Sequence, residues 1–438
     1  MRKIAYNLFV ILNFVSCAMI FGVTDNNQIQ MTIKNQSQEK MKLLLAVLSP
    51  TPELITIAEF VRSDLSCSQQ KLSGFNVEMR HLTDILSKKK MKSFFGEGFS
   101  VVIVLSVTKE GKIEWRLYDS LQATMQQGKR IALLKSLEST AHTVADQLWK
   151  ILTGQDSIFL TKIAYCKVVK KDKQLLKNIY IQSPMQYNSH CFVTGGKLLA
   201  PRWNKDLSNP LILYSEVTQA NIRLMSATLD GKRKIISNFD GLTMLANFSL
   251  DGQKVVYCAS YKGNCQLYYY YYDQAAKKGI TKRLTNNKSN NTSPNLCENG
   301  DIIFCSDFET KSPQLYCLTP TTGDIKKLTQ GGYCASPHYS DKNKTVAYSK
   351  LIGNEMQIFL YNVATQEHKQ ITFDKGNKDE SSWSPCGNYL AFVLKEGKKS
   401  RISLLNMLTH ERFFLTSEHE ACSYPAWSLR YSDVGIFA

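Results

Sequence analysis

The residue types most often used for catalysis or metal binding are present in this chain, but their spacing forms no known site. The motifs His-Glu-x-x-His, Cys-x-x-Cys and Gly-x-Ser-x-Gly do not occur in the sequence, nor does a phosphate loop or a dinucleotide fingerprint. The sequence therefore predicts a protein that is not an enzyme and that uses no metal or cofactor. The seven histidines are scattered: His81, His142, His190, His338, His368, His410 and His419.

A repeat with a period of 43 to 48 residues dominates the second part of the chain. Each repeat contains a short window in which an apolar or aromatic residue follows a small turn residue by two positions. Between windows lie short apolar, β-branched or aromatic runs divided by Gly, Asn, Asp and Pro, which disfavours helices. Such a period is typical of propeller blades built from four short strands. The windows begin at Pro201, Ala246, Pro294, Pro337, Ser381 and Pro425.

The two ends of the repeat region each hold only part of a blade. The last window lies close to the C-terminus, whereas Ile163–Cys166, Ile179–Ile181 and Lys197–Leu199 precede the first window. We expect these ends to share one blade, because an unpaired sheet edge invites association. The predicted fold is an all-β six-bladed propeller over residues 163–438, with its ring closed by the C-terminal strand.

The apolar runs are nearly continuous, as expected when both faces of each blade are covered by neighbours. In the run Tyr268–Tyr272, alternate tyrosines should face the two neighbouring blades; a nucleic-acid stacking platform is the disfavoured alternative. Cys166, Cys258 and Cys305 occupy the same place in three repeats, too far apart to bridge. Cys258 and Cys265 flank one hairpin, which leaves a disulfide or two free thiols open.

The N-terminus has the pattern of an export signal over residues 1–18, with Arg2 and Lys3 before an apolar core and a small-x-small site ending at Ala18. A lipidated Cys17 and an uncleaved anchor are the alternatives. Residues 19–40 are polar and predict a flexible segment, within which Ile29, Met31 and Ile33 alternate with polar residues.

Residues 41–154 predict a small α/β domain, followed by a linker over residues 155–162. The apolar pattern and the positions of Pro and Gly predict its elements. They are a strand over 43–48, a helix over 52–67, a weaker helix over 81–91, a hairpin of strands 99–107 and 113–118, and a long helix over 131–152.

The formal net charge is +17, or +15 without the export signal. A balance of this size is typical of nucleic-acid binding in cytosolic proteins, but here the lysines cluster in loops and turns of a chain that carries an export signal. We therefore expect a solvated basic surface and no nucleic-acid partner. An anionic envelope surface or an acidic partner is the alternative.

Three stretches resemble one family closely, the TolB proteins, which are periplasmic propellers of the Tol–Pal envelope system. They are residues 141–165, which contain Ala141-His142-Thr143 and Leu152-Thr153-Gly154; Ser289-Asn290-Asn291-Thr292-Ser293-Pro294; and Tyr424-Pro425-Ala426-Trp427-Ser428. Together with the repeats, the resemblance covers nearly all of the chain after the export signal. Ser293 replaces an acidic residue of the family pattern, and the turn Leu242–Leu245 lacks the His and Ala of the family.

The resemblance implies a monomeric, non-catalytic scaffold of the periplasm that supports envelope integrity and cell division. Its propeller would bind a Pal-like peptidoglycan-associated lipoprotein, and its N-terminal segment would bind a TolA-like inner-membrane protein by strand addition. His142 is expected to pack its helix. The alternative is an exported propeller enzyme acting on envelope glycans or peptides, which would need two or more converging titratable groups. The implied partner-binding residues are Asn290, Asn291, Thr292, Ser293, Leu242, Leu245, Ile29, Met31 and Ile33.

Overall fold

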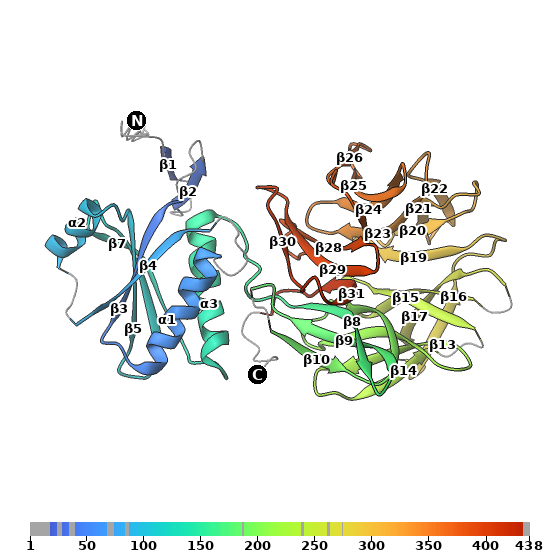
Figure 1. Cartoon of the computed structure of the whole chain (residues 1–438), viewed down its shortest axis with the longest axis horizontal. Helices are drawn as coiled ribbons and strands as arrows, with labels where there is room; N and C mark the ends of the chain where they lie inside the picture. Colours follow the sequence, from blue (N-terminus) through green and yellow to red (C-terminus); the bar gives the residue numbers. More distant parts are fainter. Residues whose placement is uncertain are drawn as a thin grey trace. The chain divides into compact units, whose positions relative to one another are not determined.

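The computed structural model describes residues 18–23, 29–34, 40–67, 74–83, 87–185, 188–237, 241–260, 263–273 and 275–431. Almost all of the predicted export signal and the last seven residues lie outside this part of the chain. The chain divides into two compact units between Leu160 and Thr161, with Tyr431 joining the first unit (Figure 1). No described helix is long and apolar enough to cross a membrane.

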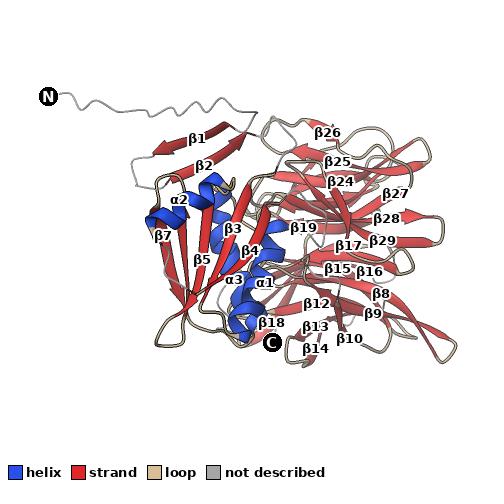
Figure 2. Cartoon of the chain, turned by 60° about the vertical axis from the view of Figure 1, so that its left-hand side comes forward, coloured by secondary structure: helices blue, strands red, loops and turns tan. Residues whose placement is uncertain are grey.

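The first unit is a five-stranded mixed sheet with helices on both faces. The strands lie in the order β4-β3-β5-β6-β7, with β3 parallel to β4 and β5 and the remaining pairs antiparallel. Figure 2 shows α1 and α3 side by side on one face of this sheet. The elements are β3 Lys42–Leu48, α1 Pro52–Ser66, β4 Asn76–Leu82, α2 Lys88–Gly96, β5 Val101–Val107, β6 Ile113–Asp119, β7 Thr124–Ile131 and α3 Leu137–Thr153.

Two predicted helices have different bounds in the structure. The helix predicted over 81–91 is wrong: residues 76–82 form β4, and α2 begins at Lys88, after Ser87 caps it by accepting a hydrogen bond from the Lys90 N–H. Polar and apolar residues alternate along Asn76–Leu82, which is the strand period. The helix predicted from residue 131 begins at Leu137, because Ser136 supplies the N-cap and Ile131 ends the edge strand β7.

His142 packs α3 against α1, as expected for a structural residue. Its Nδ1 lies 2.6 Å from Asp64 Oδ2 in α1, and its Nε2 lies 3.2 Å from Glu138 Oε1. Burial favours the neutral imidazole, but the Asp64 and Glu138 carboxylates outweigh it and raise the pKa of His142 to about 9. The imidazolium therefore holds the two helices together by ion pairing in a buried site.

The second unit consists of antiparallel four-stranded sheets in chain order. Its strands are β8 Ile163–Lys171, β9 Gln174–Gln182, β10 Ser189–Val193, β11 Lys197–Trp203, β12 Leu211–Val217, β13 Ile222–Thr228, β14 Arg233–Ser237, β15 Leu242–Phe248, β16 Lys254–Ser260, β17 Gln266–Asp273, β18 Lys278–Arg283, β19 Asn291–Leu296, β20 Ile302–Ser306, β21 Gln314–Thr319, β22 Asp324–Lys327, β23 Cys334–Ser340, β24 Thr345–Ile352, β25 Glu355–Asn362, β26 His368–Gln370, β27 Asn377–Trp383, β28 Tyr389–Glu396, β29 Lys399–Asn406, β30 Arg412–Phe414 and β31 Ala421–Trp427.

Within the described residues these strands form six four-stranded groups, four of which are joined into one 16-stranded sheet by single parallel bridges. Five of them follow the chain directly, beginning with β11, β15, β19, β23 and β27. The sixth joins both ends of the unit, because β31 pairs with β8 in the register Ala426↔Ala164, and β9 and β10 complete it. The first strands contact one another in the cyclic order β11, β15, β19, β23, β27, β31, with β31 also touching β11. This is the arrangement of a six-bladed propeller.

Hydrogen bonds link neighbouring first strands near the windows. The Trp203 indole N–H donates to Ala426 O at 3.0 Å, and the Trp427 N–H donates to Ser382 Oγ at 3.0 Å. Asn295 donates through Nδ2 to Pro337 O at 2.7 Å. The second or third residue of a window therefore binds the window of a neighbouring blade, which gives the repeated spacing a structural cause.

Four repeats contain an apolar residue followed by threonine after their last strand, as in Leu284-Thr285, and this threonine has a structural role. In four blades the threonine Oγ1 accepts a backbone N–H from the third strand, at 2.8 to 2.9 Å. Thr329 and Thr372 donate in turn to Gln314 and Gln357. These bonds hold the chain where it leaves the fourth strand for the next blade. The residues joined by these bonds are Thr285 and Leu267, Thr329 and Leu315, Thr372 and Ile358, and Thr416 and Ile402.

The tyrosine run in β17 packs as predicted between two blades. Tyr268 and Tyr270 contact the core shared with β12 and β13, whereas Tyr269 contacts the core shared with β20 and β21. Tyr272, at the end of the strand, is 49% exposed. The tyrosines therefore divide between two interfaces instead of forming one exposed stacking surface.

Candidate functional site

The first strand of every blade bends at one residue in the left-handed region. Each of these residues has a φ between 48° and 56°, and at each the register with the second strand shifts by one residue. None is glycine, so each carries a conformational cost of about 1–2 kcal/mol. Bulges and strained residues of this kind concentrate at functional sites, where they redirect side chains. The residues are Ala200, Leu245, Ser293, Ser336, Glu380 and Tyr424.

We call the surface formed by these six bulges, with the residues that precede each bulge in its strand, the bulge ring. Because the first strands contact one another in cyclic order, the ring brings together residues far apart in sequence. The predicted residues Leu245 and Ser293 are two of its six bulged positions, on the neighbouring strands β15 and β19. The predicted turns at residues 242–245 and 290–293 therefore form one continuous region, the β15–β19 side.

The β15–β19 side carries uncharged side chains. Leu242 is 39% exposed, and Leu245 is partly buried against the core between the two blades. The exposed Asn290 is fixed by Asp307, whose Oδ1 accepts the Asn290 N–H at 2.8 Å. Thr292 is half-buried and lies opposite Cys305 in the ladder between β19 and β20. This side therefore presents an apolar residue and an ordered amide on its surface.

Asn291 differs from its neighbours because its side chain is completely buried. Its Nδ2 donates to Asn287 Oδ1 at 2.9 Å, and its Oδ1 accepts the Ser306 hydroxyl at 2.8 Å. The same position is fully buried in all six first strands, so Asn291 builds the turn and does not offer its side chain to a partner. The six equivalents are Leu198, Thr243, Asn291, Cys334, Lys378 and Cys422.

The opposite β27–β31 side is charged, a feature that the repeats did not reveal. The Glu380 carboxylate accepts the Tyr424 N–H at 2.6 Å and lies 3.6 Å from Lys395 Nζ. Burial raises the pKa of Glu380, and the neighbouring Asp379 carboxylate adds to the increase. Asp379 itself accepts the Ser349 hydroxyl at 2.8 Å. A signal for this side existed in the adjacent acidic residues Asp379-Glu380, next to a window.

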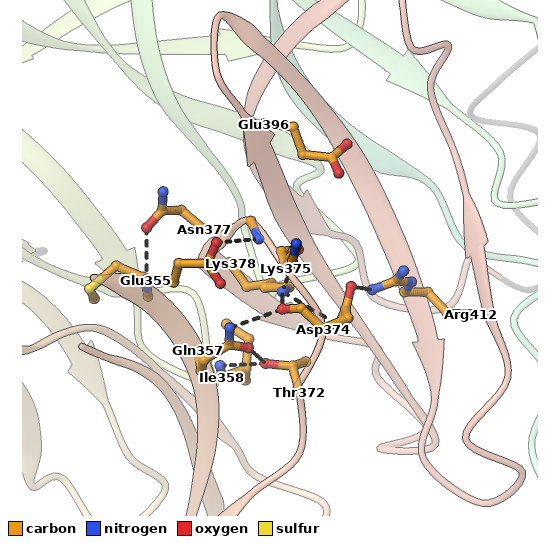
Figure 3. Close-up of polar contacts among 12 residues, drawn as sticks. Glu355, Gln357, Ile358, Thr372, Asp374, Lys375, Asn377, Lys378, Glu396 and Arg412 are labelled. Atoms are coloured by element: carbon orange, nitrogen blue, oxygen red, sulfur yellow. Dashed lines mark hydrogen bonds and ion pairs between the residues drawn. The ribbon is translucent and has the colours of Figure 1, made fainter. Parts of the chain in front are cut away.

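The loop that leads into β27 holds a buried ammonium group (Figure 3). Lys378 Nζ donates to Asp374 O and to Lys375 O, and it lies 3.4 Å from Asp374 Oδ1. Asp374 Oδ2 also accepts a hydrogen bond from Arg412 Nη1 at 2.7 Å. The pKa of Asp374 is lowered because these cations outweigh its partial burial. The charges of this loop are thus paired within the loop and with β30.

A buried histidine, His338, lies two residues after the bulge of β23. Burial lowers the pKa of His338 well below its usual value, and the positive charges of Arg202 and Lys205 lower it further. His338 Nδ1 accepts the Trp383 N–H at 3.3 Å, consistent with a neutral ring. Among the described residues, no group of three His, Cys, Asp or Glu side chains is arranged to hold a metal ion.

The remaining predicted residues lie in the N-terminal segment. Ile29, Met31 and Ile33 are in β2 Ile29–Lys34, which pairs antiparallel with β1 Ala18–Val23. This segment, expected to be flexible, therefore contains a two-stranded ladder at these positions. Residues 24–28 and 35–39 lie outside the described part of the chain.

Comparison with known proteins agrees with this architecture. The family model of the TolB beta propeller domain matches residues 149–431. The chain belongs to the TolB family. The protein named "Tol-Pal system protein TolB" from Francisella tularensis subsp. mediasiatica is 27% identical over 287 residues, which cover 62% of this chain and 63% of that protein. The match thus spans less than two thirds of that relative.

A second TolB relative and a solved TolB structure extend the comparison. The protein of the same name from Ruthia magnifica is 25% identical over 298 residues, covering 67% of this chain and 69% of that protein. The crystal structure of TolB from Acinetobacter baumannii superimposes with a TM-score of 0.73 at 21% identity, covering 90% of this chain and 97% of that one. The match to the Acinetobacter structure reaches beyond the propeller. The α/β unit and the propeller each therefore have the fold found in TolB.

Proposed function

We propose that this protein is a non-catalytic scaffold of the Tol–Pal system in the periplasm. In this proposal it acts as a monomer that binds a peptidoglycan-associated lipoprotein through the bulge ring and a TolA-like protein through its N-terminal segment. The observation that carries the proposal is the coincidence of two independent features. The two turns that the family resemblance assigns to partner binding are the ones that the cyclic contacts bring together on the β15–β19 side.

The chemistry of the β15–β19 side supports recognition instead of catalysis. A partner would bury Leu242 and Leu245 and would meet the ordered Asn290 amide, while Asn291 keeps the turn rigid. A pre-ordered surface loses little conformational entropy on binding, which favours affinity. The partner-contacting set is therefore Asn290, Thr292, Ser293, Leu242 and Leu245, with Asn291 supporting them from below.

For the N-terminal segment, the proposed mode is strand addition to β2. One edge of β2 is occupied by β1, so a TolA-like strand would either pair with the second edge or replace β1. Main-chain hydrogen bonds supply affinity in this mode, and alternate side chains such as Ile29, Met31 and Ile33 supply specificity.

The decisive experiment replaces Thr292 by arginine in the full chain. The variant should lose capture of one peptidoglycan-bound lipoprotein from envelope extracts, because a long cation would project from the half-buried position beside the Leu245 bulge. Thr321→Arg, in the exposed turn between β21 and β22, is the matched control and should keep capture. Unchanged capture by Thr292→Arg would remove this turn from the binding site.

One observation, the group around Glu380, supports the alternative that the protein is an enzyme. Glu380, Asp379 and Lys395 are converging titratable groups, as an enzyme acting on envelope glycans or peptides would require. Glu380 is, however, engaged by a backbone N–H and a lysine. Glu380→Gln should leave lipoprotein capture intact if it is peripheral, whereas loss of a hydrolytic activity on peptidoglycan fragments would support the enzyme.

A further inference from the structure

Two thiols meet beside the β15–β19 side. Cys258 lies in β16 opposite Leu267 of β17, and Cys265 immediately precedes β17. Each thiol is the largest influence on the pKa of the other. Cys258 has no exposed surface and packs with Val256 and Leu267, whereas Cys265 is partly exposed. One thiol of the pair is therefore accessible to a reagent and the other is not.

The pair is asymmetric in acidity as well as in exposure. The interaction with Cys258 lowers the pKa of Cys265 to about 7, whereas the same interaction and burial raise the pKa of Cys258. Cys265 thus forms the thiolate, which is the nucleophilic form of cysteine. The accessible thiol is the one that ionises first.

The pair also touches both segments of the β15–β19 side. Cys258 Sγ donates to Met244 O at 3.2 Å, within the turn Leu242–Leu245, and the Ser293 backbone lowers the pKa of the Cys258 thiol. Cys265 O accepts the Asn291 N–H at 2.9 Å, and the Cys265 N–H donates to Asn290 Oδ1 at 3.2 Å. A covalent change in either sulfur therefore reaches both turns directly.

We propose that Cys258 and Cys265 form a thiol–disulfide exchange site whose oxidation state controls the β15–β19 side. Its substrate is a disulfide, either a small-molecule disulfide or that of a protein oxidoreductase. The Cys265 thiolate attacks one sulfur of this substrate, forming a mixed disulfide and releasing one thiolate. Cys258 then loses its proton and attacks Cys265 Sγ, releasing the second thiolate. The pair gives up two electrons and two protons, and the substrate disulfide becomes two thiols.

Oxidation would change the bonding of the turn at 242–245. In the disulfide, Cys258 no longer carries the hydrogen that it donates to Met244 O, so this carbonyl loses a partner. The new bond also constrains the hairpin end that holds Asn290 and Asn291. This consequence for partner binding rests on the proposed function, whereas formation of the disulfide does not.

The neighbouring blade contains a natural comparison. Cys305 occupies the same place in β20 as Cys258 in β16, but the residue that matches Cys265 is Pro313, whose carbonyl accepts the Cys334 N–H at 2.9 Å. The Cys305 thiol donates to Cys334 O at 3.4 Å. Burial raises the pKa of Cys305 to about 12. Cys305 is therefore the matched control for a buried thiol without an acidic thiol beside it.

The first experiment tests the chemistry alone on the full chain. The protein is incubated with oxidised glutathione, alkylated with N-ethylmaleimide and digested with trypsin, which cleaves after Lys262 between the two cysteines. Tryptic fragments 255–262 and 263–277 should then be joined by a reducible bond. Cys265→Ser should abolish the linked fragments, and Cys305→Ser should retain them. Full alkylation of both cysteines at every ratio of oxidised to reduced glutathione would overturn the proposal.

The second experiment tests the link to the β15–β19 side without any partner. Backbone hydrogen exchange is compared between the oxidised and reduced protein, and the amides of residues 290–293 should exchange at least about threefold more slowly when oxidised. Equal exchange in a protein whose disulfide has been mapped would overturn the control of this side. If exchange and mapping succeed but Thr292→Arg still captures the lipoprotein, the partner assignment fails and the redox site stands.

Discussion

The two sides of the bulge ring share the same left-handed bulge in the backbone but differ in the charge of their side chains. On β15 and β19 the bulged residues are Leu245 and Ser293, whereas on β27 and β31 they are Glu380 and Tyr424, with φ values that differ by only a few degrees. The repeated strand thus fixes the backbone, and the side chain at the bulge is free to vary. A nearly symmetric scaffold can in this way carry an asymmetric surface, with one uncharged half and one charged half.

The charged half includes Tyr424 of the last strand, β31. Removing this strand should have the largest effect on stability of the changes considered. Ending the chain before Tyr424 removes Trp427 and more than half of β31, the partner of β8. Loss of a single buried tryptophan side chain costs about 3–5 kcal/mol, so we expect the whole propeller to unfold cooperatively. Circular dichroism melting would measure this, with a chain ending at Tyr431 as control. An unchanged melting temperature would show that the two ends do not hold the ring closed.

The equivalent buried residues Asn291 and Lys378 give the next largest contrast. Asn291→Ala should lower the free energy of unfolding by about 2–4 kcal/mol, because several buried polar partners lose their bonds. Lys378→Met should cost less than about 1 kcal/mol, because it also removes a buried charge and leaves Asp374 paired with Arg412. Urea denaturation of both variants tests the difference. Equal losses would mean that the two halves are supported in the same way.

The two sides should also differ in their response to pH. The pKa of Glu380 is raised in the folded state, mainly by burial, so its contribution to stability is present below the unfolded pKa and is lost as pH rises through the folded value. Glu380→Gln should therefore stabilise the protein at pH 7 but not at pH 4. Ser293→Ala, at the matching uncharged position, should alter stability equally at both pH values. Chemical denaturation at the two pH values would decide, and a pH-independent Glu380→Gln effect would contradict the argument.

The smallest expected effect concerns the left-handed conformation of the bulged residues. Ser293→Gly and Ser336→Gly each relieve a left-handed serine but add conformational freedom to the unfolded chain, so a net gain of about 0.5 kcal/mol is expected at both positions. Thermal melting of the two variants provides the measurement. A clear difference between them would show that the strain belongs to one side of the ring and not to the repeated strand.

The sequence allowed the propeller to be predicted because the windows mark hydrogen bonds between blades, as Trp203 and Asn295 demonstrate. The same periodic argument could not separate Asn291 from Thr292, since burial alternates along a strand and a bulge interrupts the alternation. The Glu380 group was missed because it depends on contacts among β27, β28 and β31. In the first unit, short elements such as β4 and α2 lacked a pattern long enough to distinguish strand from helix.

The pairing of β31 with β8 has a consequence for the order of events during synthesis. The Trp427 indole donates to Thr161 Oγ1 across 266 positions of sequence. The start of the propeller therefore cannot make this contact until residue 427 has been synthesised. Contacts of such long range slow folding, because the intervening chain must be ordered first. Closure of the ring is therefore expected to be a late event in the folding of the propeller.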